Sequence, residues 1–190
     1  MPGAMTATAL GFFGKLPARG DFVRSGLPGS FVRPWDDWLQ EALPVSRAML
    51  GGCWGESWLV APFWRLSLPA GVCGPDPVVG VACPSVDSVG REFPLLLAAL
   101  LPGVAHGPVE DWLTVCEHMA LDAVQNDVSP DVLADALAQL GLPAAAGPAE
   151  GGWWTEGGPY VAPSCRAAIL PDGAGLAAML RDVAMLRDVE

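Results

Sequence analysis

The sequence GFFGKLPARGDFVR, at residues 11–24, joins a short apolar run to a glycine turn, the single lysine of the protein and an Arg-Gly-Asp segment. Lys15, Arg19 and Arg24 are accompanied by only one carboxylate in this stretch, that of Asp21. The whole chain carries a formal net charge of −11, from 21 acidic and 10 basic residues. The stretch is therefore a local island of positive charge in an acidic protein, a contrast that calls for an explanation.

Length and composition indicate one globular domain. A chain of 190 residues can form one well-cored domain, and a hydrophobic fraction of 52% with 16% charged residues excludes disorder. The acidic balance argues against nucleic acid as a partner, because phosphate backbones would be repelled. No run reaches the ~18–20 apolar residues of a membrane span, and the N-terminal residues MPGAMTATAL lack the features of a secretory signal. We therefore expect a cytoplasmic protein without direct membrane insertion.

The five cysteines indicate neither a disulfide framework nor a metal site. They are odd in number, form no C-x-x-C pair, and have only His106 and His118 to supplement them. We expect reduced, mostly buried thiols and no metal or other cofactor. The cysteines are Cys53, Cys73, Cys83, Cys116 and Cys165.

The first 50 residues predict a tail, a strand and a helix. We expect a flexible tail at residues 1–7 and a first strand at residues 8–13, followed by a turn with a helix cap at residues 27–30. From Pro34 the apolar residues recur at i, i+3, i+4 and i+7, which predicts an amphipathic helix whose end is marked by Pro44. Its apolar stripe consists of Trp35, Trp38, Leu39, Ala42 and Leu43. Residues 45–50 could resume as a second helical turn before Gly51 and Gly52.

The rest of the chain predicts an antiparallel meander, further helices and closing strands. Three apolar runs rich in β-forming residues, at 58–68, 77–83 and 93–101, are joined by connections too short for helical crossovers. Helices are expected at residues 110–124 and 130–140, strands at 153–154 and 164–170, and a C-terminal helix face at 176–183. The expected fold is α+β: a single domain at residues 8–190 with an antiparallel sheet of about five strands, a central meander, flanked by helices.

A perfect hexapeptide repeat, AMLRDV, occupies residues 178–183 and again 184–189. Six residues turn a helix by about 600°, so the two copies would face different directions. We interpret the repeat as a sequence duplication at a frayed end.

The sequence contains no recognisable catalytic motif. The Gly14-Lys15 pair lacks the earlier glycine and the following Ser or Thr of a phosphate loop, and no G-x-G-x-x-G opens a helix. Ser85 lies outside a G-x-S-x-G elbow, and both histidines are interpreted as structural or surface residues. A hydrolase-like enzyme that uses Ser85 or a cysteine with a remote histidine, His106 or His118, stays open as the alternative to a binding module.

Ser85, Asp87 and Arg91, in PSVDSVGREFP, form a second polar group. Asp87 can bind backbone amides within a turn and Arg91 can form forked hydrogen bonds with a carboxylate, so a self-satisfied loop is the favoured interpretation. A polar surface presented at the edge of a sheet is the functional alternative. The Trp153-Trp154 pair cannot have both side chains inward if it forms a strand, which leaves one of them for a protein contact.

Three long segments carry a resemblance to a known family. The segment GFFGKLPARGDFVRSGLPGSFVRPWDDWLQ resembles the opening of TagF proteins, also called ImpM, which are accessory proteins of bacterial type VI secretion systems. The likeness continues, in matching order, through APFWRLSLPAGVCG and PSVDSVGREFPLLLAA and, more weakly, GGWWTEGG.

The resemblance implies a non-enzymatic, post-translational repressor of type VI secretion that binds a partner such as the FHA-domain scaffold protein of the system. We expect no phosphatase fusion, because this sequence has no metal-binding Asp cluster and no second long domain. A structural component of the secretion machine is a further hypothesis, which would require obligate assembly. By position, the family motifs imply partner binding by Lys15, Arg19, Asp21, Phe22, Trp35, Asp36, Trp38, Ser85, Asp87, Gly90 and Arg91.

A physical hypothesis connects the two polar groups. If the first strand lies beside the meander, residues 14–21 and residues 85–91 would meet at one end of the sheet. The resulting patch could dock an acidic or phosphorylated segment of a partner. Under the simpler alternative, Asp21 and Arg91 only brace the fold.

Overall fold

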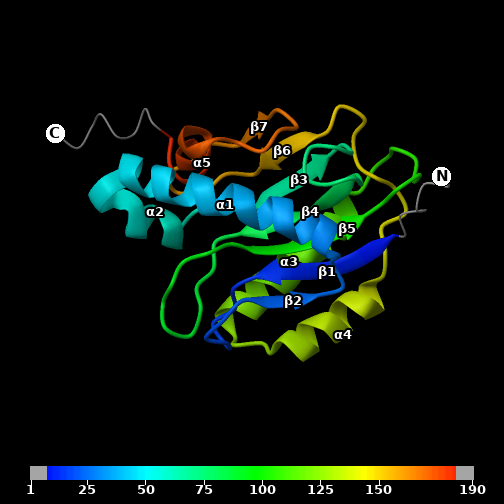
Figure 1. Cartoon of the computed structure of the whole chain (residues 1–190), viewed down its shortest axis with the longest axis horizontal. Helices are drawn as coiled ribbons and strands as arrows, with labels where there is room; N and C mark the ends of the chain where they lie inside the picture. The colour runs from blue at the N-terminus through cyan, green and yellow to red at the C-terminus, as the bar shows by residue number, and fades with distance from the viewer. Residues whose placement is uncertain (1–7, 183–190) are drawn as a thin grey trace.

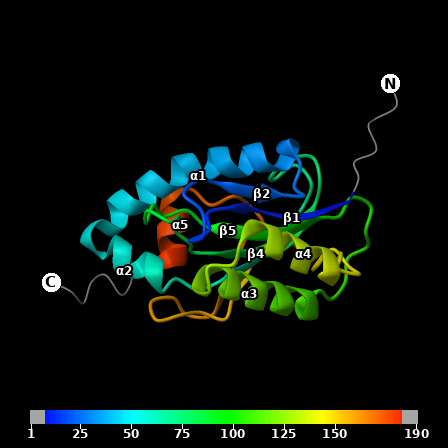
Figure 2. The ribbon, with the colours of Figure 1, turned by 90° about the horizontal axis from the view of Figure 1, so that it is seen from below.

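The computed structural model describes residues 8–182 and shows three layers. Seven strands form one antiparallel sheet, and helices cover both of its faces (Figures 1 and 2). The expected α+β class is confirmed, with seven strands in place of about five. The predicted tail at residues 1–7 and the second hexapeptide copy at residues 184–189 lie outside the described residues.

The strand order across the sheet is β2-β1-β5-β4-β3-β6-β7. The predicted meander forms its centre, because β3, β4 and β5 are antiparallel neighbours. The strands are β1 Ala9–Gly14, β2 Val23–Ser25, β3 Trp64–Leu68, β4 Val78–Cys83, β5 Leu95–Leu100, β6 Gly152–Thr155 and β7 Ser164–Arg166.

Helices from the two ends of the chain cover one face of the sheet, and the helices between them cover the other (Figure 2). On the first face lie α1 Gly29–Leu50 and α5 Gly173–Leu180, with the short α2 Trp54–Leu59 beyond the end of α1. On the second face lie α3 Glu110–Gln125 and α4 Pro130–Leu140. The predicted cap of α4 is confirmed, since Ser129 Oγ accepts a hydrogen bond from the Val132 amide.

The sheet is buried on both faces, which explains the continuous apolar runs of its central strands. Successive side chains of a strand point to opposite faces. On β5, Leu96 and Leu100 pack into the core formed with α1 and α5, whereas Leu95 and Leu97 pack into the core formed with α3 and α4. A single strand therefore anchors both helical layers.

An ion-pair network that the sequence does not predict ties β3 to α3. Arg65 donates from Nε to Glu117 Oε1 (2.7 Å) and from Nη1 to Glu110 Oε2 (2.7 Å). Its Nη2 also donates to Thr114 Oγ1 (3.0 Å). The hydrogen bond with Glu117, together with the charge of Glu117 and the contact with Glu110, raises the pKa of Arg65 above its ordinary value. Arg65 is therefore always charged and connects the sheet to α3.

Three local expectations are wrong. Residues 23–25, between the predicted first strand and the predicted turn at residues 27–30, carry no strand prediction but form β2, because they pair with β1. Trp58, placed at the start of the first meander strand, belongs to α2 and packs with Trp54 in a small core at the end of α1. At the expected cap, residues 27–30, α1 begins at Gly29 after Pro28 and has no side-chain cap hydrogen bond, because Ser30 already lies inside the helix.

The predicted helix end at Pro44 is also wrong: residues 45–50 are helical, as the sequence allowed, but they continue α1 without a break to Leu50. Proline lacks the backbone donor of an interior helical residue and normally ends a helix. Ala42 before Pro44, and Ser46 and Leu50 after it, are all buried. Packing against the sheet and α5 therefore outweighs the missing hydrogen bond, and Figure 2 shows α1 curving across the sheet.

The first AMLRDV copy is not frayed, contrary to expectation. Its Met179 and Leu180 are buried at the end of α5. Arg181 Nη1 donates to Ser57 Oγ (3.2 Å), and the Asp182 amide donates to the Tyr160 carbonyl (2.7 Å). Residues 178–182 are therefore an integral part of the fold.

We expect Pro44→Ala to raise the free energy of unfolding by about 1–2 kcal/mol, because it restores a helical donor at an exposed position. Urea denaturation measures the change. Pro69→Ala, at an exposed loop position after β3, is the matched control and should bring no gain. An unchanged or lower stability for Pro44→Ala would show that the helix is not weakened there.

Candidate functional site

Two loops that are distant in sequence meet at one end of the sheet. One follows β1 and the other connects β4 to β5, and β5 pairs with both β1 and β4. We call residues 15–22 and 85–91 the two-loop corner. The hypothesis that these segments meet is confirmed, because hydrogen bonds connect them directly.

Two hydrogen bonds to backbone carbonyls join the loops along a seam. The Ser88 amide donates to the Arg19 carbonyl (2.8 Å), and Ser85 Oγ donates to the Lys15 carbonyl (2.7 Å). Gly20 lies so close to this seam that a Cβ added to it would be 3.2 Å from Ser88 Oγ. The two loops therefore form one continuous surface.

The carboxylate of Asp87 is the centre of the corner. Its Oδ2 lies 3.0 Å from Lys15 Nζ and 2.7 Å from Arg91 Nε. Its Oδ1 accepts hydrogen bonds from the backbone amides of Val89 (3.1 Å) and Arg91 (2.9 Å). The side chain of Asp87 is 0% exposed and that of Lys15 is 8% exposed.

The protonation of Asp87 follows from these contacts. Burial on its own would raise the pKa of this carboxyl. The hydrogen bonds from the Arg91 amide, the Lys15 ammonium and the Arg91 guanidinium outweigh burial and hold the pKa well below its usual range. Asp87 is therefore an anion in the folded protein at neutral pH.

Arg91 joins both loops from the outside of the corner. Its Nε binds Asp87, and its Nη2 donates to the Gly20 carbonyl (2.6 Å). The side chain is nevertheless 61% exposed. The guanidinium is thus held in a fixed orientation while part of it faces solvent.

An aromatic group supports the first loop. Phe22 stacks on Phe13, with ring centroids 5.6 Å apart, and meets Phe93 edge-on at 4.7 Å. Lys15 Nζ lies 5.2 Å from the centroid of the Phe22 ring. Phe22 is 41% exposed, so one side of the ring stays on the surface.

The predicted partner-binding residues fall into three groups. Lys15, Ser85 and Asp87 are buried inside the two-loop corner, whereas its exposed residues are Arg19, Asp21, Phe22, Gly90 and Arg91. The three residues from the helix are not brought to the corner. Trp35 is fully buried and packs with the partly exposed Trp38 against Trp153 of β6, and Asp36 accepts a hydrogen bond from Gln40.

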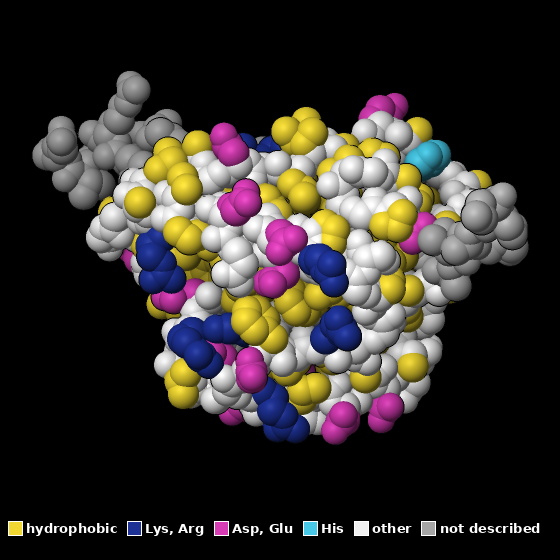
Figure 3. All heavy atoms as spheres, viewed as in Figure 1, with side chains coloured by type: hydrophobic (Ala, Val, Ile, Leu, Met, Phe, Trp, Pro, Cys, Tyr) yellow, Lys and Arg dark blue, Asp and Glu magenta, His cyan; other side chains and the backbone are white. Residues whose placement is uncertain are grey.

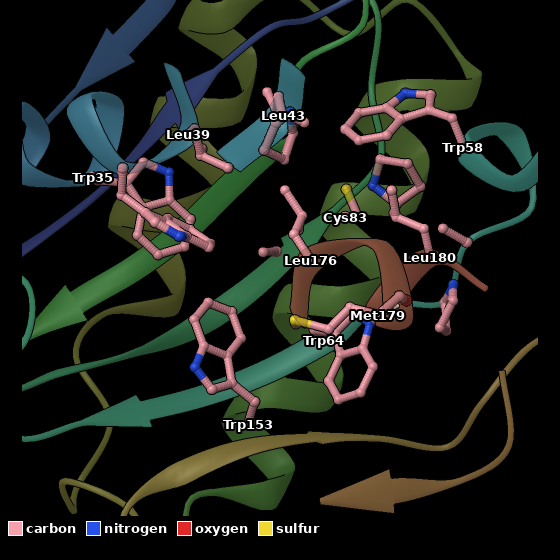
Figure 4. A pocket seen from close by; sticks show the side chains of 16 residues that line it. Trp35, Leu39, Leu43, Trp58, Trp64, Cys83, Trp153, Leu176, Met179 and Leu180 are labelled. Carbon is pink, nitrogen blue, oxygen red and sulfur yellow. Dashed lines mark hydrogen bonds between the residues drawn. The ribbon is translucent and has the colours of Figure 1, made fainter. Parts of the chain in front are cut away.

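An apolar cavity of about 50 Å³ lies between the sheet, α1 and α5 (Figure 4). Its walls include Trp35, Trp64, Trp153, Leu176 and Met179. The volume is small, and the lining is hydrocarbon and indole apart from the Met179 thioether and the Cys83 thiol. Among the lining side chains there is no carboxylate, histidine or lysine that could act as an acid or base.

Ser85 and three of the five cysteines are placed unfavourably for catalysis. Ser85 Oγ is buried and donates its hydrogen bond to the Lys15 carbonyl. Burial raises the pKa of the Cys83 thiol to about 12, and the thiols of Cys73 and Cys116 behave likewise. His106 and His118 are exposed, and within residues 8–182 neither forms a hydrogen bond to a serine or cysteine. Nor do residues 8–182 hold a group of three His, Cys, Asp or Glu side chains placed to bind a metal.

Comparison with known proteins identifies the family. Residues 11–140 match the family described as TagF N-terminal domain, type VI secretion system-associated. The chain belongs to the TagF N-terminal domain family. This TagF-family chain is also similar to the crystal structure of PA0076 from Pseudomonas aeruginosa PAO1, at 30% sequence identity and a TM-score of 0.80. That match covers 90% of this chain and 94% of the other, and no curated protein matches.

Among residues 8–182, no helix of this TagF-family chain is both long enough and apolar enough to cross a bilayer.

We expect Asp87→Asn to lower the urea midpoint, because it removes the anion that compensates buried Lys15. The folded-state pKa of Asp87 is depressed, so its contribution is complete above its unfolded pKa of about 4 and is lost as the pH falls through the folded value. The difference from wild type should therefore be largest above about pH 5 and shrink toward about pH 2. Asp21→Asn, at an exposed position, is the control; equal effects of the two substitutions at every pH would refute a buried charge network.

Proposed function

We propose that this chain is a non-enzymatic, post-translational repressor of type VI secretion that acts in the cytoplasm by binding a partner such as the FHA-domain scaffold protein. The association of its family with type VI secretion supports the choice of system. The main support for binding is the two-loop corner. It presents exposed cations on a rigid base, and its buried polar groups hold the two loops together.

Rigidity favours recognition at this surface. Asp87 receives two backbone and two side-chain donors, and Arg91 is fixed at two of its nitrogens. A surface that is already ordered loses less conformational entropy when a partner binds. A small number of contacts at the corner would therefore suffice for binding, because little of their free energy is lost to ordering the surface.

Charge sets the corner apart from the rest of the molecule. Residues 15–22 and 85–91 contain three cations, Lys15, Arg19 and Arg91, and two carboxylates, Asp21 and Asp87, so the net charge of the corner is +1, against −11 for the chain. Figure 3 shows Lys and Arg side chains across the middle and lower part of one face, with Asp and Glu side chains among them. An acidic partner would be attracted there and repelled elsewhere, which would orient the complex.

Binding to the scaffold tests the proposal directly. We expect Arg19→Glu to raise the dissociation constant for the purified FHA-domain scaffold at least about tenfold, because it replaces an exposed cation by an anion. Among residues 8–182 the Arg19 side chain donates only to the adjacent Ala18 carbonyl, and the backbone hydrogen bonds of Arg19 are kept in the variant, so the fold should be unaffected. Arg33→Glu is the matched control: it makes the same charge change at an exposed position near the start of α1, which β2 places away from the corner.

The secretion phenotype separates a repressor from a structural component. Deleting the gene should raise secretion, and restoring it should lower secretion again. Loss of secretion on deletion, or absence of scaffold binding by the wild-type chain, would contradict the proposal.

A further inference from the structure

We propose that the two-loop corner recognises an acidic peptide segment that carries an apolar side chain. This inference deepens the proposed function, on which the choice of surface rests, by naming the chemistry of the partner. It follows from which donors the corner leaves unused and which apolar groups it exposes.

The unused donors belong to arginines. Lys15, the single lysine, is buried against Asp87 and is not free to bind a partner. Arg91 uses Nε and Nη2 within the corner, and among residues 8–182 its Nη1 has no hydrogen-bond acceptor. The Arg19 side chain is exposed and, among residues 8–182, donates only to the Ala18 carbonyl (3.2 Å). A guanidinium presents donors in a planar fork that matches a carboxylate, so two such groups favour an acidic segment.

The apolar groups lie on both loops. Phe22 is 41% exposed and Val89 is 70% exposed, each within two residues of the seam joining Gly20 to Ser88. Phe22 is not free to turn inward, because Phe13 and Phe93 already hold its ring. A ligand with carboxylates alone would leave both side chains in water. A segment with an apolar residue among its carboxylates would bury them, at about 25 cal/mol for each Å² removed from water.

Electrostatics and apolar contact make different contributions to such a complex. The exposed arginines would speed the encounter with an acidic peptide. Their attraction for it would weaken with salt, since the Debye length falls from about 10 Å at 0.1 M to about 3 Å at 1 M ionic strength. Contact with Phe22 and Val89 would persist at high salt. The corner therefore predicts a complex that weakens with salt but is not abolished by it.

A peptide titration tests the inference without the scaffold. The probes are three acetylated, amidated peptides, Glu-Glu-Leu-Glu-Glu, Glu-Glu-Ser-Glu-Glu and Lys-Lys-Leu-Lys-Lys, added to the ¹⁵N-labelled full chain. We expect the acidic leucine peptide to shift the amide resonances of residues 19–22 and 88–91. The serine peptide should bind more weakly, and the basic peptide should leave these resonances unchanged. Arg19→Glu and Phe22→Ser should each reduce binding of the acidic leucine peptide severalfold, whereas Arg33→Glu should not.

The outcomes separate this inference from the proposed function. Shifts at the corner that are larger with the acidic leucine peptide than with the serine peptide uphold the inference even if the scaffold does not bind. Absent shifts, equal shifts with the serine or the basic peptide, or shifts confined to other residues overturn it, even if the scaffold binds. Phe22→Ser is checked for its native amide spectrum before titration, and Val89→Ser, at a more exposed position, provides the same test if Phe22→Ser unfolds.

Discussion

The burial of Asp87 between Lys15 and Arg91 fixes the shape of the two-loop corner. A carboxylate removed from water is costly unless its oxygens find donors and its charge finds a counter-charge. The donors come from both loops: Lys15 belongs to the loop after β1, and the amides of Val89 and Arg91 belong to the loop after β4. Neither loop can move away without leaving a charge unpaired, so the two are held as one body.

The sheet makes this arrangement possible. Gly14, at the end of β1, has φ +142°, and a Cβ there would lie 2.0 Å from the Pro94 carbonyl oxygen at the start of β5. Only glycine permits that approach. It brings Lys15, the next residue, beside the segment that precedes β5. Because β5 is buried on both faces, the base of the corner is part of the hydrophobic core rather than an independent surface loop.

The sequence predicted those parts of the fold that repeat a local pattern. The β3–β4–β5 meander, the cap of α4 at Ser129 and the meeting of two polar loops followed from periodicity, turn residues and motif order. Features set by tertiary packing did not follow from it. The continuation of α1 past Pro44 depends on the burial of one helix face. The short strand β2 forms because its backbone pairs with that of β1. The Lys15–Asp87 ion pair spans 72 positions, and no local spacing signals it.

The same contacts explain why Asp87, and Ser85, which the sequence left open as a nucleophile, serve architecture in the fold. A general acid or base needs a pKa near the working pH and an accessible proton, but Asp87 has a depressed pKa and its oxygens are occupied. A serine nucleophile needs a base, but Ser85 donates to a backbone carbonyl. Arg19 contributes little to the fold and remains exposed, as does one side of Phe22, whose ring also packs against Phe13 and Phe93. Within the corner, the residues that build the surface and those available to a partner are thus largely different side chains, so recognition can change while the supporting charge network is kept.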